Sequence, residues 1–268
     1  EPRFSQESEW FTLNDAKLQI LPVQAQVPMA TASMISPSGM TLAGKYGSGV
    51  LSIGSMSDEG LASLPLQWSF AEESAATHDQ VVDRADWRIM FTWHVAETRE
   101  RAEKEVEWGL QRWHNDYTVA TLQRPGAPVF DSTEQAIDVL ARSEGSAAVI
   151  GTPDDLIEQI LDMVKVTGGF GKAIGFVHDW ASPADTAKSW DMVARYVIPE
   201  VNGQLDSMRE SNAFVKENRE YFQRAQKAVL AKINENERAS EALAAGGVGR
   251  GAPIAAHNEP TDSRSTSG

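Results

Sequence analysis

Small hydroxylated residues are concentrated in the sequence SMISPSG, which begins at residue 33 and joins an apolar run to a helical pattern. Ser36 and Ser38 provide hydroxyl groups there, and Gly39 lets the backbone come close to a ligand. These hydroxyls and the free amides at a helix start donate hydrogen bonds to an anion, so the turn is a candidate phosphate site. Serine and glycine are also ordinary helix caps, and their spacing alone leaves that simpler role open.

Two histidines near the ends of apolar runs are candidates for proton transfer. His178 lies in the sequence VHDW, and a histidine beside the indole of Trp180 could shuttle a proton and stack on a planar ring. Neighbouring strand residues point to opposite faces, so His178 and Asp179 share a pocket only if the strand has already ended. A cap or rim contact is the alternative role. His94 is the weaker candidate, because a lone strand histidine is more often a hydrogen-bonded core residue.

Other classes of chemistry have no support in the sequence. There is no P-loop, no nucleophile elbow and no HExxH or other metal-ligand spacing, so we expect no metal. The absence of cysteine excludes disulfides, thiolate ligands and a cysteine nucleophile, and it fits a reducing cytoplasm. The formal net charge of -14 argues against nucleic-acid and anionic-membrane partners, which are bound by clustered Lys and Arg. No apolar run approaches the ~18 residues of a membrane span. We therefore expect a soluble, cytoplasmic protein.

Four apolar runs are the predicted strands that position these residues: PMATAS, GVLSIG, WRIMFTWHVA and KAIGFVHDW. Helical patterns follow them, and Thr152 and Ser182 begin the clearest helix-capping sequences. Strands that alternate with helices pair in parallel, which predicts an α/β protein with either a doubly wound sheet or a (β/α)8 barrel. In both folds ligands bind beyond the carboxyl ends of the strands, where the hydroxylated turn and His178 lie.

The flanking regions have different patterns. Residues 1–27 hold two short extended pieces broken by Asn14 and Asp15. Residues 204–245 predict one long polar helix, whose single narrow apolar stripe would lie against the barrel or a partner subunit. Residues 246–268 contain few apolar side chains and are predicted to be disordered.

The number of strands is too small for a complete barrel. A (β/α)8 barrel needs about 250 residues and eight strands, whereas residues 28–203 hold four convincing strand–helix units. A half barrel would leave two sheet edges open and one apolar face uncovered. Because the chain also begins at Glu1 without a methionine, we expect an N-terminally truncated protein.

Five stretches between Glu9 and Pro199 resemble, in the same order, the flavin-dependent luciferase-like monooxygenases, and most closely their limonene-monooxygenase-like branch. The stretches are WFTLNDAKLQILP, ASMISPSGMTLAGKYGSGVLSI, WHVAETRERA, AAVIGTPDDLIEQI and GGFGKAIGFVHDWASPADTAKSWDMVARYVIP. The resemblance implies a (β/α)8 TIM barrel. Residues 1–27 would belong to an insertion, and residues 28–203 to strands five to eight.

The resemblance also implies a cofactor and a reaction. Reduced FMN, supplied by a separate flavin reductase, would be bound at the turn after the fifth strand by Met34, Ile35, Ser36, Ser38 and Gly39. The protein would insert one oxygen atom from O2 into a small apolar substrate, and we expect it to form a homo-oligomer. The main catalytic histidine would belong to the absent first half, so the isolated segment would have little activity.

The substrate pocket would lie at the end of the eighth strand. The resemblance places His178 and Trp180 near this pocket, and we add His94 as a third candidate. Two other functions remain open. A deazaflavin could replace FMN in a hydride-transfer enzyme, because nothing in the hydroxylated turn separates the two cofactors. Alternatively, the chain is a non-catalytic half-barrel subunit that supports an active chain through the 205–245 helix.

Overall fold

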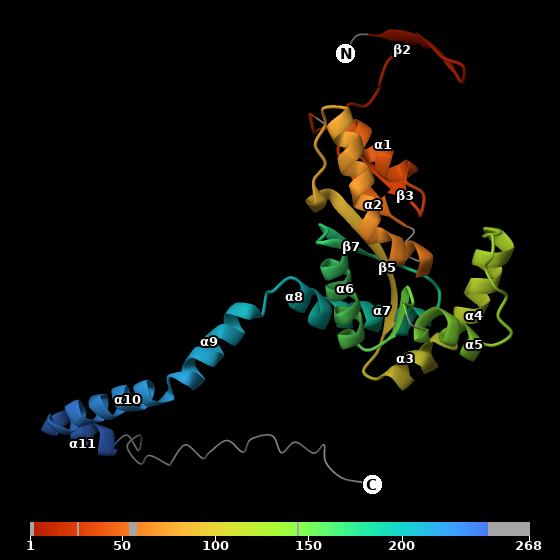
Figure 1. Cartoon of the computed structure of the whole chain (residues 1–268). Coiled ribbons are helices and arrows are strands. Elements are labelled where there is room, and N and C mark those ends of the chain that lie inside the picture. Colours follow the sequence, from red (N-terminus) through yellow and green to blue (C-terminus); the bar gives the residue numbers. More distant parts are fainter. Residues whose placement is uncertain (1–2, 26, 54–57, 144, 246–268) are drawn as a thin grey trace. The chain divides into compact units, whose positions relative to one another are not determined.

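The computed structural model describes residues 3–25, 27–53, 58–143 and 145–245 (Figure 1). These residues fall into two units, which divide between Gln204 and Leu205. The predicted disorder of residues 246–268 lies outside the described part. Within that part, no helix has the length and apolar character needed to cross a membrane.

A parallel sheet forms the centre of the first unit. In chain order, its strands are β3 (Ala30–Ser33), β4 (Gly49–Ser52), β5 (Trp87–Val95), β6 (Ala148–Gly151) and β7 (Lys172–Phe176). Ile89 in β5 pairs with both β4 and β7, so these two strands lie on opposite edges of β5. Thr92 pairs with both β6 and β7, and β6 therefore follows β4 along one edge. The four predicted strands thus lie side by side in the order β3-β4-β5-β7.

Helices follow most of the strands. Those between β3 and β6 are α1 (Ser38–Tyr46), α2 (Asp58–Thr77), the 3-10 turn η2 (Arg84–Asp86), α3 (Arg99–Val106), α4 (Leu110–Trp113), the π-helix η3 (His114–Thr121), α5 (Thr133–Ile137) and the π-helix η4 (Asp138–Arg142). Those after β6 are α6 (Pro153–Thr167), α7 (Pro183–Met192), the π-helix η5 (Val193–Val197) and α8 (Ile198–Val201). This alternation confirms the predicted α/β class with a parallel sheet.

The helices cover one face of the sheet. Val50, Trp87, Ile89 and Phe91 point to this face and are buried against apolar side chains of α1, α2 and α6. The ring of Trp87 stacks on Trp68 of α2 at 4.8 Å between centroids, and its indole N–H donates to the Ser52 hydroxyl at 2.9 Å. Burial of this apolar area supplies the main stabilising free energy of the unit.

The opposite face of the sheet is less covered. Strand alternation and register place Leu51, Arg88, Met90, Thr92 and Phe176 on that face. Most of these side chains are only half-buried. The candidate site described below lies against this second face.

Predicted caps set the direction of two helices. The Thr152 hydroxyl accepts the Asp155 amide at 3.4 Å, and the Asp155 carboxylate accepts the Thr152 amide at 2.8 Å, which completes a capping box. Ser182 accepts the Asp185 amide at 3.2 Å at the start of α7. Both caps confirm the sequence pattern and lie at the same end of the sheet as the carboxyl ends of β6 and β7.

The hairpin near the N-terminus corrects one prediction. It consists of β1 (Phe4–Glu7) and β2 (Thr12–Ala16), which pair antiparallel. The predicted break at Asn14 and Asp15 is wrong, because both residues lie within β2. The chain instead reverses after Ser8, whose hydroxyl accepts the amides of the next turn residues at 3.1–3.2 Å.

The second unit also departs from the sequence expectation. In place of one long helix, its described residues form α9 (Asp206–Glu217), α10 (Arg219–Asn234) and α11 (Glu237–Ala245). Asn218 interrupts the first pair with φ -102° and ψ 26°, outside helical values. The Asn236 side chain accepts the Ala239 amide at 3.1 Å and begins the third helix. Local side-chain bonds of asparagine compete with helix continuation at both positions.

Candidate functional site

The hydroxylated turn lies between β3 and α1 and is open to solvent. Ser36 and Ser38 are exposed, and their hydroxyls approach each other at 3.4 Å. The residue before α1 is Pro37, and no side chain caps the helix. The first amides of α1 have no intrahelical acceptor, which is the normal condition of a helix start. The simpler role as ordinary helix caps is therefore wrong for the hydroxyls of Ser36 and Ser38, because neither hydroxyl caps α1.

Gly39 brings α1 close to β3. An added Cβ would lie 2.5 Å from the Ala32 carbonyl oxygen and 2.8 Å from the Ser33 Cα. Glycine at this position is therefore required by helix–strand packing. Met34 and Ile35 are 45% and 47% exposed, and the Gln67 side chain donates to the Met34 carbonyl at 2.8 Å. The turn is thus anchored at its start and accessible beyond it.

His178 and Trp180 lie together just beyond the sheet. β7 ends at Phe176, so strand alternation no longer separates His178 from Asp179. The two residues still do not share a pocket, because His178 and Trp180 are buried whereas Asp179 is exposed. The two rings stack at 3.6 Å between centroids with an interplanar angle of 24°. Neither ring nitrogen of His178 nor the indole nitrogen of Trp180 has a hydrogen-bond partner within the described residues.

Burial determines the charge of His178. Its side chain is removed from water, and this desolvation lowers its pKa to about 3, with a further lowering from the charge of His94. The imidazole is therefore neutral at pH 7. A neutral, unpartnered imidazole can still accept a hydrogen bond from a molecule that reaches it, or donate one to it.

His94 has the structural role that the sequence favoured. Its Nε2 lies 2.9 Å from a carboxylate oxygen of Glu105 in α3, and both side chains are buried. Arg101 donates to the other oxygen of Glu105 at 2.5 Å. This network connects β5 to α3. The structure therefore makes His94 a hydrogen-bonded core residue, and it does not line the cavity described next.

A cavity of about 330 Å³ lies against the less covered face of the sheet, beside Trp180. β5 and β7 contribute Met90, Thr92 and Phe176. The remaining walls come mainly from α4, η3 and the turn that follows, with these residues: Trp113, His114, Tyr117, Thr118, Leu122 and Arg124. Cavities of this size with mostly apolar walls are the usual form of small-molecule sites.

Sequence reasoning missed the wall formed by residues 113–124. Of the predicted site residues, only Trp180 lines this cavity, while His178 contacts Trp113 at 5.7 Å between ring centroids. The predicted phosphate turn does not line it. The sequence held one signal for this wall, which was the spacing of Trp113 and Tyr117 by one helical turn. In the structure their ring centroids lie 5.2 Å apart.

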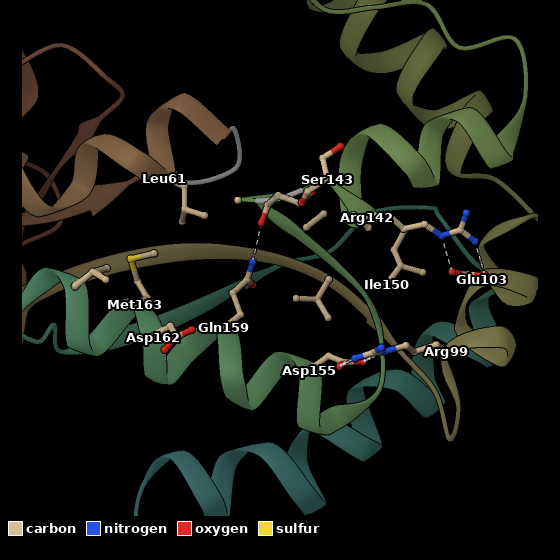
Figure 2. Close-up of a pocket in the computed structure, with 16 residues that line it drawn as sticks. Leu61, Arg99, Glu103, Arg142, Ser143, Ile150, Asp155, Gln159, Asp162 and Met163 are labelled. Atoms are coloured by element: carbon tan, nitrogen blue, oxygen red, sulfur yellow. Dashed lines mark hydrogen bonds and ion pairs between the residues drawn. The ribbon is translucent and has the colours of Figure 1, made fainter. Parts of the chain in front are cut away.

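A larger pocket of about 700 Å³ lies between β6 and α6, as Figure 2 shows. Arg99 and Asp155 face each other there at 2.5 Å, and Arg142 pairs with Glu103 at 2.7 Å. The Arg99 hydrogen bond lowers the pKa of Asp155 to about 2. Both arginines of this pocket are thus already paired, and it contains no predicted site residue. The smaller, apolar cavity is therefore the better candidate site.

The residues described by the structure contain no group of three or more His, Asp or Glu side chains able to hold a metal ion. The parallel sheet and its helices define an α/β protein, with an open hydroxylated turn and a buried aromatic cluster beyond the strands. Proteins of this class bind ligands at the carboxyl edge of the sheet. The family described as Luciferase-like monooxygenase matches residues 1–169. The chain belongs to this family.

Named relatives agree with this assignment. The chain is 38% identical over 213 residues to 4-hydroxyprotoasukamycin monooxygenase from Streptomyces nodosus subsp. asukaensis, covering 78% of this chain and 57% of that protein. It is also 38% identical over 216 residues to limonene 1,2-monooxygenase from Rhodococcus erythropolis, covering 80% and 54%. The chain thus spans about half the length of the curated relatives it matches.

A solved structure shares the fold. The oxygenating constituent of 3,6-diketocamphane monooxygenase from Pseudomonas putida, in complex with FMN, superposes with a TM-score of 0.53 at 23% sequence identity. The match covers 75% of this chain and 59% of that one. At this identity the likeness concerns the fold of the sheet and its helices.

Proposed function

We propose that residues 28–203 are the second half of a (β/α)8 barrel that binds reduced FMN and inserts one oxygen atom from O2 into a small apolar substrate. The order β3-β4-β5-β7, with one face covered by helices, supports the half barrel. A barrel of eight strands would continue from the outer edges of β3 and β7. The length of the relatives leaves room for the missing strands.

The observation that carries the proposal is the open turn before α1. Hydroxyls of Ser36 and Ser38 and the first amides of α1 form a donor set that fits a phosphate group. The helix dipole adds a partial positive charge at the same place. Met34 and Ile35 offer exposed apolar surface beside these donors for the rest of a flavin.

Reduced flavin, when bound, supplies the reaction with oxygen. The residues of this chain provide binding and a dry environment. Trp113, Phe176 and Trp180 surround an apolar space, which excludes water from a bound substrate. His178 remains neutral beside that space and can accept a hydrogen bond from a polar group of the substrate.

The partners in this proposal are a separate flavin reductase, O2, an apolar substrate and a second copy of the chain in a homo-oligomer. A cytoplasmic location would provide the reduced flavin. The isolated chain would show little turnover, because half of the barrel is needed to close the site.

Flavin titration tests the proposal. With the missing half supplied, we expect FMN to bind more tightly than riboflavin, because only FMN carries the phosphate. The double substitution Ser36→Ala and Ser38→Ala should reduce FMN affinity by roughly tenfold or more, since hydrogen bonds to charged groups contribute about 1.5–3 kcal/mol each. Ser69→Ala, at a half-buried position on α2 outside the turn, is the control.

The outcomes separate the alternatives. Equal affinity of the completed protein for FMN and riboflavin would contradict the phosphate site. Substrate turnover without oxygen uptake, supported by a deazaflavin, would replace the monooxygenase by a hydride-transfer enzyme. Tight flavin binding and full turnover by residues 1–268 alone would contradict the half-barrel proposal.

A further inference from the structure

The apolar cavity beside Trp180 has one charged residue in its wall. Among its lining residues, all of which the structure describes, Arg124 is the only one that carries a permanent charge. No Asp or Glu lines the cavity, and the Arg124 guanidinium makes no ion pair or hydrogen bond with any described residue. This arginine differs from Arg99 and Arg142 in the larger pocket, which are both paired with carboxylates.

The local backbone holds Arg124 in this position. The chain leaves η3 at Leu122, whose amide donates to the Tyr117 carbonyl at 2.8 Å. Gln123 then adopts φ 48°, a left-handed conformation that is uncommon for a residue other than glycine. The Arg124 amide returns to the Thr118 carbonyl at 3.2 Å. This strained turn directs residue 124 back to the cavity, and strained backbone of this kind is often found at ligand sites.

The surroundings favour an anion beside Arg124. The side chain is half-buried, and apolar walls strengthen its attraction for a negative charge relative to water. His114 in the same wall is bonded to the Pro128 carbonyl at 3.0 Å, and burial lowers its pKa, with a smaller lowering from Arg124. Thr118, buried next to it, makes no side-chain hydrogen bond with described residues and offers a hydroxyl donor.

We infer that this cavity binds an apolar molecule that carries a single carboxylate, with the carboxylate paired to Arg124 and the hydrocarbon part among Trp113, Phe176 and Trp180. A guanidinium matches a carboxylate with two parallel N–H bonds. One positive charge balances one carboxylate, whereas a phosphate monoester carries about -1.5 to -2 at pH 7. The inference rests on the proposed function in taking this cavity as the substrate site, but binding itself requires no flavin.

Matched ligands test the inference on the whole chain without flavin. Octanoate and octanamide have the same hydrocarbon length and differ in charge, and calorimetric titration measures the affinity of each. We expect the chain to bind octanoate about tenfold more tightly than octanamide. In Arg124→Gln the affinity for octanoate should fall to that for octanamide, while octanamide binding stays unchanged.

Two further variants complete the test. Arg112→Gln is the control, because Arg112 lies over the Trp108 ring at 5.1 Å and does not line the cavity. It should keep the full preference for octanoate. Arg124→Lys keeps the charge and should retain part of the preference, which provides a second measurement if the Gln variant does not fold.

Several results would overturn the inference. They are equal affinities of the unmodified chain for both ligands, a preference that persists in Arg124→Gln, tighter binding of octyl phosphate than of octanoate, and no binding of either octyl ligand. Each is independent of flavin titration. A protein that fails to bind FMN but prefers octanoate would therefore contradict the proposed function and still support this inference.

Discussion

His178 shows how burial controls the chemistry of a single residue. Its imidazole is stacked on Trp180 and has no hydrogen-bond partner among the described residues, so the cost of desolvating a charge keeps it neutral. The residue type was visible in the sequence. Its depressed pKa depends on walls contributed by α4 and β7, which the sequence did not place around it.

This depressed pKa predicts acid sensitivity. In the unfolded chain the imidazole takes up a proton near its ordinary pKa of 6.5, whereas in the folded protein it does so only near about 3. The unfolded state binds more protons between these pH values. Protonation of His178 therefore does not reduce the free energy of unfolding above pH ~6.5, and it lowers this free energy progressively as the pH falls below that value. The slope reaches at most about 1.4 kcal/mol per pH unit for this group.

Urea unfolding between about pH 6.5 and about pH 4.5 measures this slope, which should be smaller in His178→Phe. It should not vanish, because burial also lowers the pKa of His114. An unchanged slope in the Phe variant would show that His178 is not desolvated.

Gly39 provides a prediction about close packing. In Gly39→Ala the new Cβ meets backbone atoms of Ala32 and Ser33, which cannot rotate away. We expect the free energy of unfolding to decrease by about 1–3 kcal/mol, as for other overpacking substitutions. Circular dichroism during urea unfolding measures the change. Ser36→Ala in the same turn is exposed and should stay within about 0.5 kcal/mol; equal stability of both variants would contradict the packing role.

At the scale of elements, helix starts were the most predictable features. Thr152 and Ser182 form the expected caps because their bonds involve residues only three positions away. The positions at which strands and helices end were less predictable. The run of residues 172–180 leaves the sheet after Phe176, and the helical region after α7 continues through Pro199 to Val201 because a proline in the first turn of α8 needs no amide.

The cap of α6 predicts a measurable contribution to stability. Thr152→Ala removes the hydroxyl that accepts the Asp155 amide and should lower the free energy of unfolding by about 1 kcal/mol. Chemical denaturation followed by circular dichroism measures this difference. Thr41→Ala, at an exposed position within α1, is the comparison and should have a smaller effect. If both variants unfold at the same urea concentration, the capping box does not stabilise α6.

At the scale of the whole molecule, the buried clusters belong to the first unit alone. Every member of both apolar clusters lies between Met40 and Val201. Within the described part of the second unit, the apolar side chains that recur every seven residues are all exposed: Met208, Val215, Phe222 and Val229. We therefore expect the first unit to fold without residues 205–268.

Removal of residues 205–268 tests this independence. We expect the shortened chain to keep its unfolding midpoint, with a change in free energy of less than about 0.5 kcal/mol. Tryptophan fluorescence is a suitable probe, because all eight tryptophans precede residue 205. Loss of the cooperative transition, or a large decrease in its midpoint, would show that the second unit stabilises the first.

The sequence by itself determined the α/β class, the parallel pairing of the four main strands, the caps of α6 and α7, and the family. These features follow from local periodicity and from bonds between residues close in the chain. Only the tertiary structure decided which side chains meet. It buried His94 against Glu105, turned His178 inward past the end of β7, and brought Arg124 to the wall of an apolar cavity. Contacts between distant segments depend on packing geometry, which no local pattern encodes.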